Sequence, residues 1–308
     1  MSTNAIQSSH IYSTYFAPRG RSRIYTLGMQ IAQLYLSPFD QIIGFIGEAG
    51  SGKSVLIKGM FPGIERTHDD DGVNVRPLPL LEQEYETGFF TPHTYHLDIR
   101  FETGFHQLSE LADAVRLAVR RGKRIIIEHF DLIYPLLGVN ANLLIGVGEQ
   151  IVITRPNLFG PLPQELCDIV YPSLAYRLMA HSAEDLCEYA MTQEQMLACS
   201  HGDIRHGFVL EFNEHQPDID IPTLEARVNE LIRQDLPIDY YDESHILLGG
   251  AQHYCTGPRT HVRSTGRIIG FRLLDHFIYD HFHKTYMLVG CVGDDSEENI
   301  RKLETIHG

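Results

Sequence analysis

Residues 47–54, Gly-Glu-Ala-Gly-Ser-Gly-Lys-Ser, constrain the fold of this chain more than any other segment. They match the pattern G-x-x-x-x-G-K-[ST] and lie between an apolar run, residues 41–47, and a helix-like run, residues 54–61. Glycines at these places let backbone N–H groups turn toward phosphate oxygens, and the start of the following helix adds partial positive charge. The order strand, loop, helix is the context in which this pattern binds phosphate. The segment therefore predicts a phosphate-binding P-loop in an α/β domain.

The same loop predicts which residues contact the ligand. Lys53 is expected to reach the β- and γ-phosphates, and the Ser54 hydroxyl is expected to ligate Mg²⁺. ATP or GTP with Mg²⁺ is therefore the expected cofactor, and no motif selects the base. The residues expected to bind the nucleotide are Gly47, Glu48, Ala49, Gly50, Ser51, Gly52, Lys53, Ser54 and Val55.

Two acidic residues end predicted strands and complete the expected catalytic set with Lys53. Glu128 ends RIIIE, and Asp98 ends HTYHLD. An acid at the end of a neighbouring strand can hold Mg²⁺ or orient the attacking water. HTYHLDIR, together with the loop and RIIIEHF, resembles the small ATPase of the bacterial threonylcarbamoyl-adenosine tRNA modification system. That resemblance implies a role for Asp98 in positioning Mg²⁺ or water, and an aspartate that only caps the end of its strand is the alternative.

A second interpretation starts from HDDDGVNVR, residues 68–76. The segment resembles the acidic loop of small-molecule P-loop kinases such as adenylylsulfate-kinase-like enzymes. By that resemblance Asp69, Asp70 or Asp71 would accept the proton of a substrate hydroxyl, and Arg76 would hold an anion. A solvated acidic loop is the alternative, and the sequence leaves both open.

The pattern of strands and helices predicts two domains. Strands expected at 93–100, 124–130 and 150–156 alternate with helix-like segments, which favours a mainly parallel sheet in residues 1–180, with an N-terminal extension. Beyond residue 180 the pattern predicts an α+β domain, residues 181–308. We expect a helix at 182–200 with Ser182 as its N-cap, and a hairpin or strand pair at 263–277.

Three segments of the C-terminal half resemble one family in the same order. They are GFVLEFNEH (207–215), LEARVNELIRQDLPIDYYDE (224–243) and CTGPRTHVRSTGRIIGFRLL (255–274). They are similar to the second additional, or editing, domain of alanyl- and threonyl-tRNA synthetases and of free-standing alanyl-tRNA editing proteins. The resemblance covers about residues 200–293. It implies an editing-type fold and partners such as aminoacyl-tRNA, tRNA or a free amino acid.

The family hydrolyses mischarged aminoacyl-tRNA at a zinc site built from an H-x-x-x-H pair and a C-x-x-x-H signature. By the resemblance Cys255 and His261 are two zinc ligands, although the spacing here is longer by two residues. No H-x-x-x-H pair precedes residue 207, and a third ligand has to come from elsewhere. His253 is the preferred candidate because it lies two residues before Cys255 on a strand-like segment. Other candidates are His201, His206 and His245; a metal-free binding pocket is the alternative.

Composition limits the partners. The net charge is −15 over 308 residues, so a basic face for nucleic acid has to be local. The single basic cluster, Arg19, Arg21 and Arg23, is interpreted as a solvated arm. No apolar run is long enough for a bilayer, no secretory signal is recognisable, and five scattered cysteines favour a reducing cytoplasm.

These features together predict an ATPase with an editing-like domain that acts around aminoacyl-tRNA, tRNA or an amino acid. A small-molecule kinase and a non-catalytic sensor of nucleotide and amino acid remain the alternatives. The strongly negative charge disfavours tight tRNA binding and favours small ligands or a transient partner.

Overall fold

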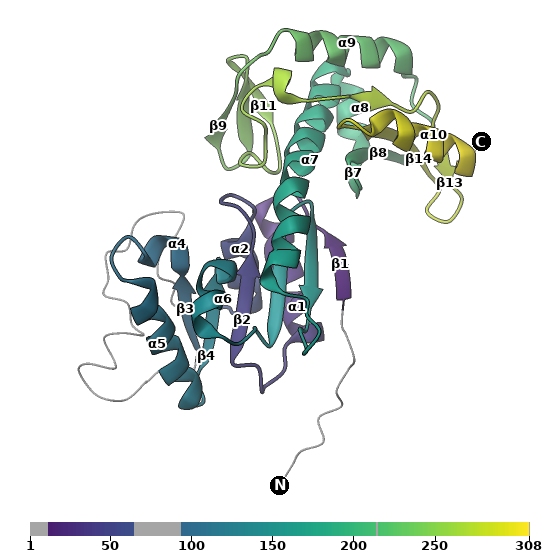
Figure 1. The fold of residues 1–308 in the computed structure, drawn as a ribbon. Coiled ribbons are helices and arrows are strands. Elements are labelled where there is room, and N and C mark those ends of the chain that lie inside the picture. Colours follow the sequence, from purple (N-terminus) through teal and green to yellow (C-terminus); the bar gives the residue numbers. More distant parts are fainter. Residues whose placement is uncertain (1–11, 65–93, 214, 308) are drawn as a thin grey trace. The chain divides into compact units, whose positions relative to one another are not determined.

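The computed structural model describes residues 12–64, 94–213 and 215–307. The chain divides into two compact units (Figure 1). The first contains residues up to Ala17 and then Arg21–Pro172, and the second contains Pro18–Gly20 and Ser173–Gly308. By this division the second unit begins at Ser173, apart from Pro18–Gly20. The acidic segment of the kinase interpretation, Asp69, Asp70, Asp71 and Arg76, lies outside the described residues.

The first unit is built on a six-stranded mixed sheet with the order β1-β6-β5-β2-β4-β3. The four strands β3, β4, β2 and β5 are parallel, whereas β6 and β1 are each antiparallel to their neighbours. This confirms the prediction of an α/β domain with a mainly parallel sheet. The strands are β1 Tyr12–Phe16, β2 Ile42–Ile46, β3 Thr94–Asp98, β4 Arg124–Glu128, β5 Leu143–Val147 and β6 Gln150–Thr154.

Helices cover both faces of this sheet (Figure 1). On one face α1 (Arg21–Tyr35) and α2 (Lys53–Met60) share a core with inward side chains of β2 and β5. On the other face α5 (Leu108–Arg120), α6 (Phe130–Leu137) and the first turns of α7 (Pro163–Ala190) pack against alternate residues of the same strands. A short helix, α4 (Ile99–Glu102), follows β3. Burial on both faces explains the continuous apolar run of β2.

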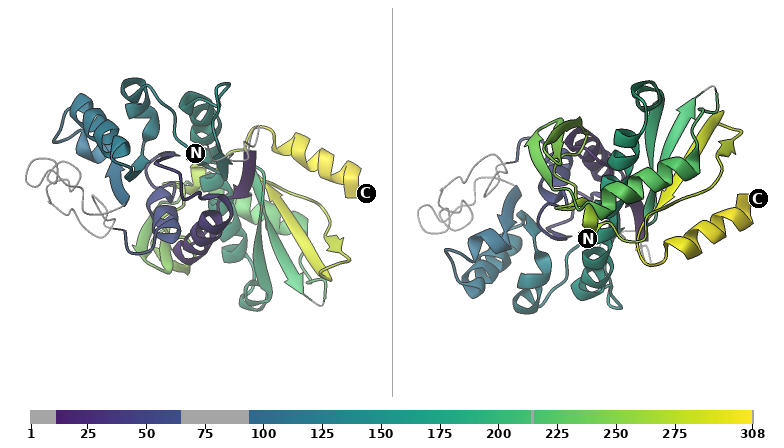
Figure 2. Two further views of the ribbon diagram at one scale, coloured as in Figure 1. Left: turned by 90° about the horizontal axis from the view of Figure 1, so that it is seen from below. Right: turned by 90° about the horizontal axis from the view of Figure 1, so that it is seen from above.

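The second unit contains two antiparallel sheets. The inner side chains of β8 (Gly207–Asn213) share a core with the second half of α7 and with α9 (Ile221–Arg233). Helix α10 (Ser296–His307) packs on the opposite face of the sheet that contains β8 (Figure 2). One sheet is β11-β10-β9; the other is β12-β14-β8-β7, with β13 paired to β14. The elements are α8 Gln193–Ala198, β7 Cys199–Ile204, β8 Gly207–Asn213, α9 Ile221–Arg233, β9 Ile238–Asp242, β10 His245–Leu248, β11 Ala251–Tyr254, β12 Arg272–Leu273, β13 Ile278–Asp280, β14 Thr285–Cys291 and α10 Ser296–His307.

Two expectations for this unit are wrong. Ser182 is not an N-cap, because α7 runs without interruption for 28 residues and the Ser182 hydroxyl donates to the Leu178 carbonyl one turn earlier. Residues 263–277 do not form a hairpin. They contain a 3₁₀ turn, Thr265–Arg267, and the two-residue strand β12, which pairs with the distant β14 instead.

Within the described part of the chain, no helix combines the length and the apolar character needed to cross a membrane.

Candidate functional site

The glycine-rich loop joins the end of β2 to the start of α2 in the first unit. Gly47, Gly50 and Gly52 all have positive φ angles, and Gly52 is the residue before the first turn of α2. A Cβ atom on Gly47 would lie 2.5 Å from the Val147 carbonyl oxygen, so only glycine fits there. The loop therefore presents the open N-terminus of α2, where backbone N–H groups are available to an anion.

Lys53 is buried at the base of this loop. Its ammonium group donates to the carbonyl oxygens of Gly47 and Glu48, both at 2.9 Å. Burial lowers the pKa of Lys53, while the negative charges of Glu128 and Asp98 oppose that shift. The cation is thus held next to the loop and close to two acids from neighbouring strands.

Glu128 and Ser54 come together beneath the loop. Ser54 Oγ donates to Glu128 Oε1 at 3.2 Å, and His96 Nε2 makes a 3.0 Å hydrogen bond to the same oxygen. Burial alone would raise the pKa of Glu128, but the hydrogen bond from His96 and the positive charge of Lys53 outweigh it and lower the pKa to about 2. Glu128 is therefore a carboxylate that accepts hydrogen bonds from both Ser54 and His96.

Asp98 lies beside Glu128, since the two residues are register partners on β3 and β4. Its side chain also accepts from the Phe101 backbone N–H at 3.1 Å and caps α4. Nearby Glu102 is buried, and burial together with the Asp98 charge raises its pKa to about 7. The structure thus brings the three expected catalytic residues to one end of the sheet, and it adds a capping role for Asp98.

Two histidines of this region were not predicted from the sequence. His96 precedes Asp98 by two residues on β3 and bonds to Glu128. His129 follows Glu128 directly and has a φ of 56°, an uncommon conformation for a residue with a side chain. Burial, together with the charges of Lys53 and Arg100, lowers its pKa to about 3. Alternation along β3 was the available signal for His96, because residues two apart on a strand share a face.

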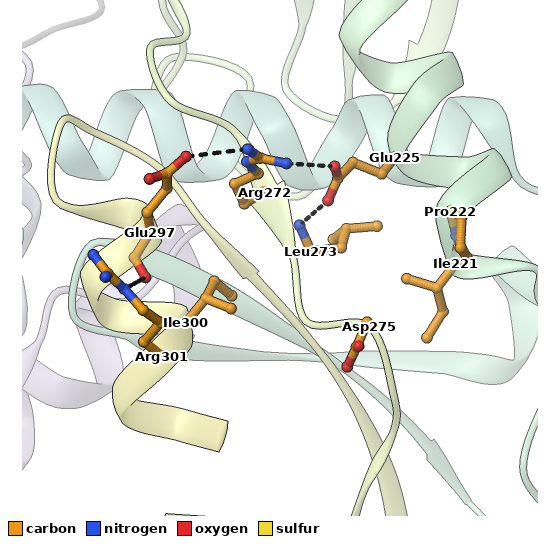
Figure 3. Close-up of a pocket in the computed structure, with 9 residues that line it drawn as sticks. All are labelled: Ile221, Pro222, Glu225, Arg272, Leu273, Asp275, Glu297, Ile300 and Arg301. Carbon is orange, nitrogen blue, oxygen red and sulfur yellow. Dashed lines mark hydrogen bonds and ion pairs between the residues drawn. The ribbon is translucent and has the colours of Figure 1, made fainter. Parts of the chain in front are cut away.

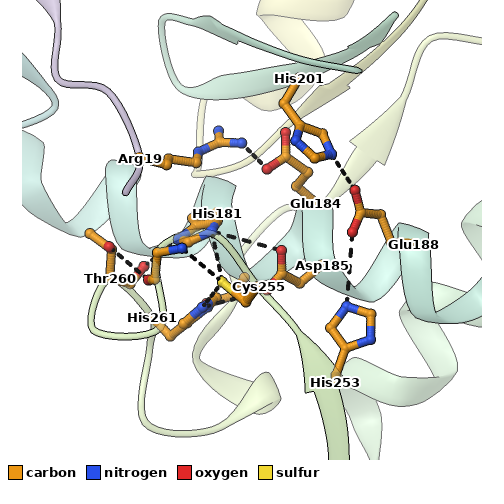
Figure 4. Close-up of polar contacts among 12 residues, drawn as sticks. Arg19, His181, Glu184, Asp185, Glu188, His201, His253, Cys255, Thr260 and His261 are labelled. Carbon is orange, nitrogen blue, oxygen red and sulfur yellow. Dashed lines mark hydrogen bonds and ion pairs between the residues drawn. The ribbon is translucent and has the colours of Figure 1, made fainter. Parts of the chain in front are cut away.

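A second cluster lies in the C-terminal unit (Figure 4). The ligand-type atoms of His181, Asp185, Cys255 and His261 all lie within 4.8 Å of one another. Cys255 Sγ lies 3.4 Å from His181 Nε2 and 3.2 Å from His261 Nε2. His181 and Asp185 are one turn apart on α7, so that both side chains project from one face. Cys255 and His261 thus meet, and an H-x-x-x-D pair stands where the resemblance led us to look for H-x-x-x-H.

Both histidines of this cluster are held through their Nδ1 atoms. His181 Nδ1 donates to the Thr260 carbonyl at 3.0 Å, and His261 Nδ1 donates to Ser182 Oγ at 3.2 Å. The Val262 N–H also donates to Ser182 Oγ, at 3.1 Å. These bonds leave each Nε2 facing Cys255. Metal-binding histidines are oriented in this way by partners behind them.

The electrostatics of the cluster suit a cation. Burial raises the pKa of Asp185 and of the Cys255 thiol well above their usual values, and it lowers the pKa of His261 to about 3. Asp185 Oδ2 is buried and makes no hydrogen bond within the described residues. Two neutral imidazoles, a thiol and a carboxyl match the donor types that zinc prefers. The residues present therefore fit a zinc ion.

The other candidate histidines lie outside this group of four. His253 is buried near Glu188, and His201 bonds to Glu188. His206 stacks on Tyr176 and bonds to Asp295, and His245 bonds to Asp242. The four-residue spacing of His181 and Asp185 in HSAED would have predicted this pair from the sequence. We did not consider it, because we interpreted Ser182 as the N-cap of a helix that begins there.

Arg19 is not part of a solvated arm. It is buried, and its guanidinium pairs with Glu184 and lies 3.1 Å from Asp203. Arg21 and Arg23 belong to the first turn of α1. The basic cluster of the sequence is therefore divided between a buried ion pair and a helix, and it offers no continuous basic face.

One pocket of about 430 Å³ lies beside α9, β12 and α10 (Figure 3). Arg272 in this pocket already pairs with Glu225 at 3.4 Å and with Glu297 at 3.1 Å. None of the predicted site residues lines it. The lining residues are Ile221, Pro222, Glu225, Arg272, Leu273, Asp275, Glu297, Ile300 and Arg301.

Neither a scan against protein-family models nor a search of the curated proteins finds a match to this chain.

Proposed function

We propose that the first unit binds a nucleoside triphosphate with Mg²⁺ and hydrolyses it. The observation that carries this proposal is the 3.2 Å contact between Ser54 Oγ and Glu128 Oε1 at the N-terminus of α2. A hydroxyl and a carboxylate are oxygen ligands of the kind that Mg²⁺ takes, and the loop above them supplies N–H donors for the phosphates. Lys53 would neutralise phosphate charge, and Asp98 with Glu128 would position the ion or the attacking water.

Binding is tested with Lys53→Ala, using Lys58→Ala on the same helix as the matched control. Lys53→Ala should weaken ATP–Mg²⁺ affinity in calorimetry by at least about tenfold, because a charge-assisted contact is lost. Lys58→Ala should bind as the wild type does. Equal affinity in all three proteins would contradict the nucleotide site.

Hydrolysis is tested separately from binding. Glu128→Gln and Asp98→Asn should slow turnover about 100-fold or more while changing affinity little, because positioning acts in the transition state. The kinase alternative predicts the reverse pattern. In that case Asp70→Asn or Asp71→Asn would abolish phosphate transfer and Asp98→Asn would be silent.

For the second unit we propose a zinc-binding module that recognises an amino acid, free or esterified to tRNA. The support is the cluster of His181, Asp185, Cys255 and His261 and the Nδ1 contacts behind its two histidines. Four protein donors fill a tetrahedral zinc shell, which favours a structural role for the ion over deacylation. The net charge of −15 favours a small ligand over tight binding of the tRNA body.

Elemental analysis of protein purified without chelator tests this module. Cys255→Ser should lose about one equivalent of zinc, since a thiolate ligand is removed. The exposed His276→Ala serves as a control and should retain the metal. Wild-type protein with less than about a tenth of an equivalent would contradict the proposal. Rapid deacylation in an assay with mischarged tRNA would show that the zinc ion has a catalytic role and not a structural one.

A further inference from the structure

Helix α7, which carries His181 and Asp185, also carries Glu188, and Glu188 belongs to a second group of ligand-type side chains (Figure 4). Glu188 on α7 and Cys199 and His201 on β7 have ligand atoms within 4.8 Å of one another. Cys199 and His201 are two apart on β7, so that their side chains project from the same face of the strand. None of these three belongs to the group around Cys255.

Glu188 is the centre of this group. One of its carboxylate oxygens, Oε1, accepts a hydrogen bond from His201 Nε2 and lies 3.9 Å from Cys199 Sγ. The other oxygen, Oε2, lies 3.9 Å from His253 Nε2. His253 is 8% exposed, and its Nε2 atom has no hydrogen-bond partner among the described residues. A buried ring nitrogen without a bond, directed at a carboxylate, is an independent sign of a missing ligand.

The buried carboxyl groups of this region also favour a cation as a partner. Asp185 and Glu188 are buried carboxyl groups one turn apart on α7, and they form a further group with His253 within 4.8 Å. Arg19 pairs with the neighbouring Glu184 instead. In the described parts of the chain, no lysine or arginine forms an ion pair with Asp185 or Glu188. Buried carboxylates are stable when they are paired or when they coordinate a metal.

We propose that Glu188, Cys199 and His201 bind a second divalent transition-metal ion of the zinc class, beside the ion held by the group around Cys255. A thiolate, an imidazole and a carboxylate select such an ion over Mg²⁺ or Ca²⁺, which take oxygen ligands alone. His253 lies 3.9 Å from the opposite oxygen of Glu188, in the group that contains Asp185, and it is not one of the three donors to this ion. Because Asp185 and Glu188 belong to one three-residue group, the two ions are neighbours and the centre is dinuclear.

The experiment is a metal titration of the full-length protein after removal of metal with a chelator, with Zn²⁺ and Co²⁺ as the probes. The wild type should bind about two equivalents. Cys199→Ser and His201→Ala should each bind about one, and the Co²⁺ form of Cys199→Ser should lose part of the thiolate-to-cobalt charge-transfer absorption. His276→Ala, an exposed histidine outside both groups, should still bind two.

The outcomes separate the ion at Glu188 from the zinc module proposed above; only the dinuclear arrangement rests on that module. Cys255→Ser should keep the ion at Glu188, so that Cys199→Ser and Cys255→Ser each lose one equivalent and the double variant loses both. If the wild type binds one equivalent that Cys255→Ser abolishes and Cys199→Ser leaves intact, the second site is refuted and the first stands. If Cys199→Ser alone abolishes a single equivalent, the first site is refuted. Circular dichroism of each variant verifies that it is folded.

Discussion

At the residue scale, Asp185 and Cys255 predict how metal binding responds to protons. Burial raises the pKa of both groups well above their usual values, and the Cys255 thiol is therefore protonated at pH 7 in the metal-free protein. Metal ligands have to be deprotonated, and zinc binding should therefore release about one proton from Cys255. Calorimetry in two buffers of different ionisation enthalpy measures that number. Cys255→Ser should lower it by about one, and no release in the wild type would rule out a Cys255 ligand.

Glu128 makes a residue-scale prediction about stability and pH. Its pKa is lowered from 4.5 to about 2 in the folded state. A lowered pKa gives stability that is fully present above pH 4.5 and is lost as the pH falls toward 2; the size is about 3 kcal/mol. Glu128→Gln should therefore lose less unfolding free energy than the wild type between pH 5 and pH 2. The exposed Glu304→Gln should follow the wild type, and parallel curves for all three proteins would contradict the prediction.

At the scale of elements, the close packing of α1 on α2 requires glycine at positions where helix propensity alone would favour alanine. Alanine is a better helix former than glycine by about 1 kcal/mol. A Cβ on Gly59 of α2 would nevertheless lie 2.1 Å from the Tyr25 carbonyl of α1, and one on Gly28 would lie 2.5 Å from the Leu56 carbonyl. Gly59→Ala should therefore destabilise the first unit by about 1–3 kcal/mol in chemical denaturation. Ser109→Ala, at an exposed position of α5, is the control and should change stability by less than about 0.5 kcal/mol. A stabilising Gly59→Ala would show that the two helices separate easily.

At the scale of the whole molecule, the two units have separate cores and separate candidate ligands. The buried apolar clusters draw their members from one unit or the other. A ligand that binds only the folded state stabilises by about 2.7 kcal/mol at a hundredfold excess over its Kd. In calorimetric scans, ATP–Mg²⁺ should raise the melting temperature of the first unit and zinc that of the second. Lys53→Ala should abolish only the first shift and Cys255→Ser only the second. A single transition raised by either ligand would mean that the units unfold together.

The local parts of this architecture could be predicted from short stretches of the amino-acid sequence. A glycine pattern between an apolar run and a helix can be recognised in a stretch of about twenty residues, because turn geometry, strand burial and helix propensity are local properties. The α/β character of the first unit, the loop at residues 47–54 and the strand-end positions of Asp98 and Glu128 followed from such patterns. Strands that pair with a partner far along the chain were harder to predict from the sequence. Strands β1 and β5 were not predicted, since β1 is defined by its antiparallel register with β6, far along the chain.

Contacts between side chains that are distant in the sequence depend on how the elements pack. Cys255 and His181 are 74 positions apart, and their contact depends on how the loop after β11 packs against α7. The same packing makes Ser182 a partner of His261 inside a continuous helix, where local preference alone favoured a helix start. It also buries Arg19 against Glu184, although a short basic run is usually solvated. Propensity is a weak local preference, and burial with hydrogen bonding to distant residues overrides it because each such contact is stabilised by the surrounding core.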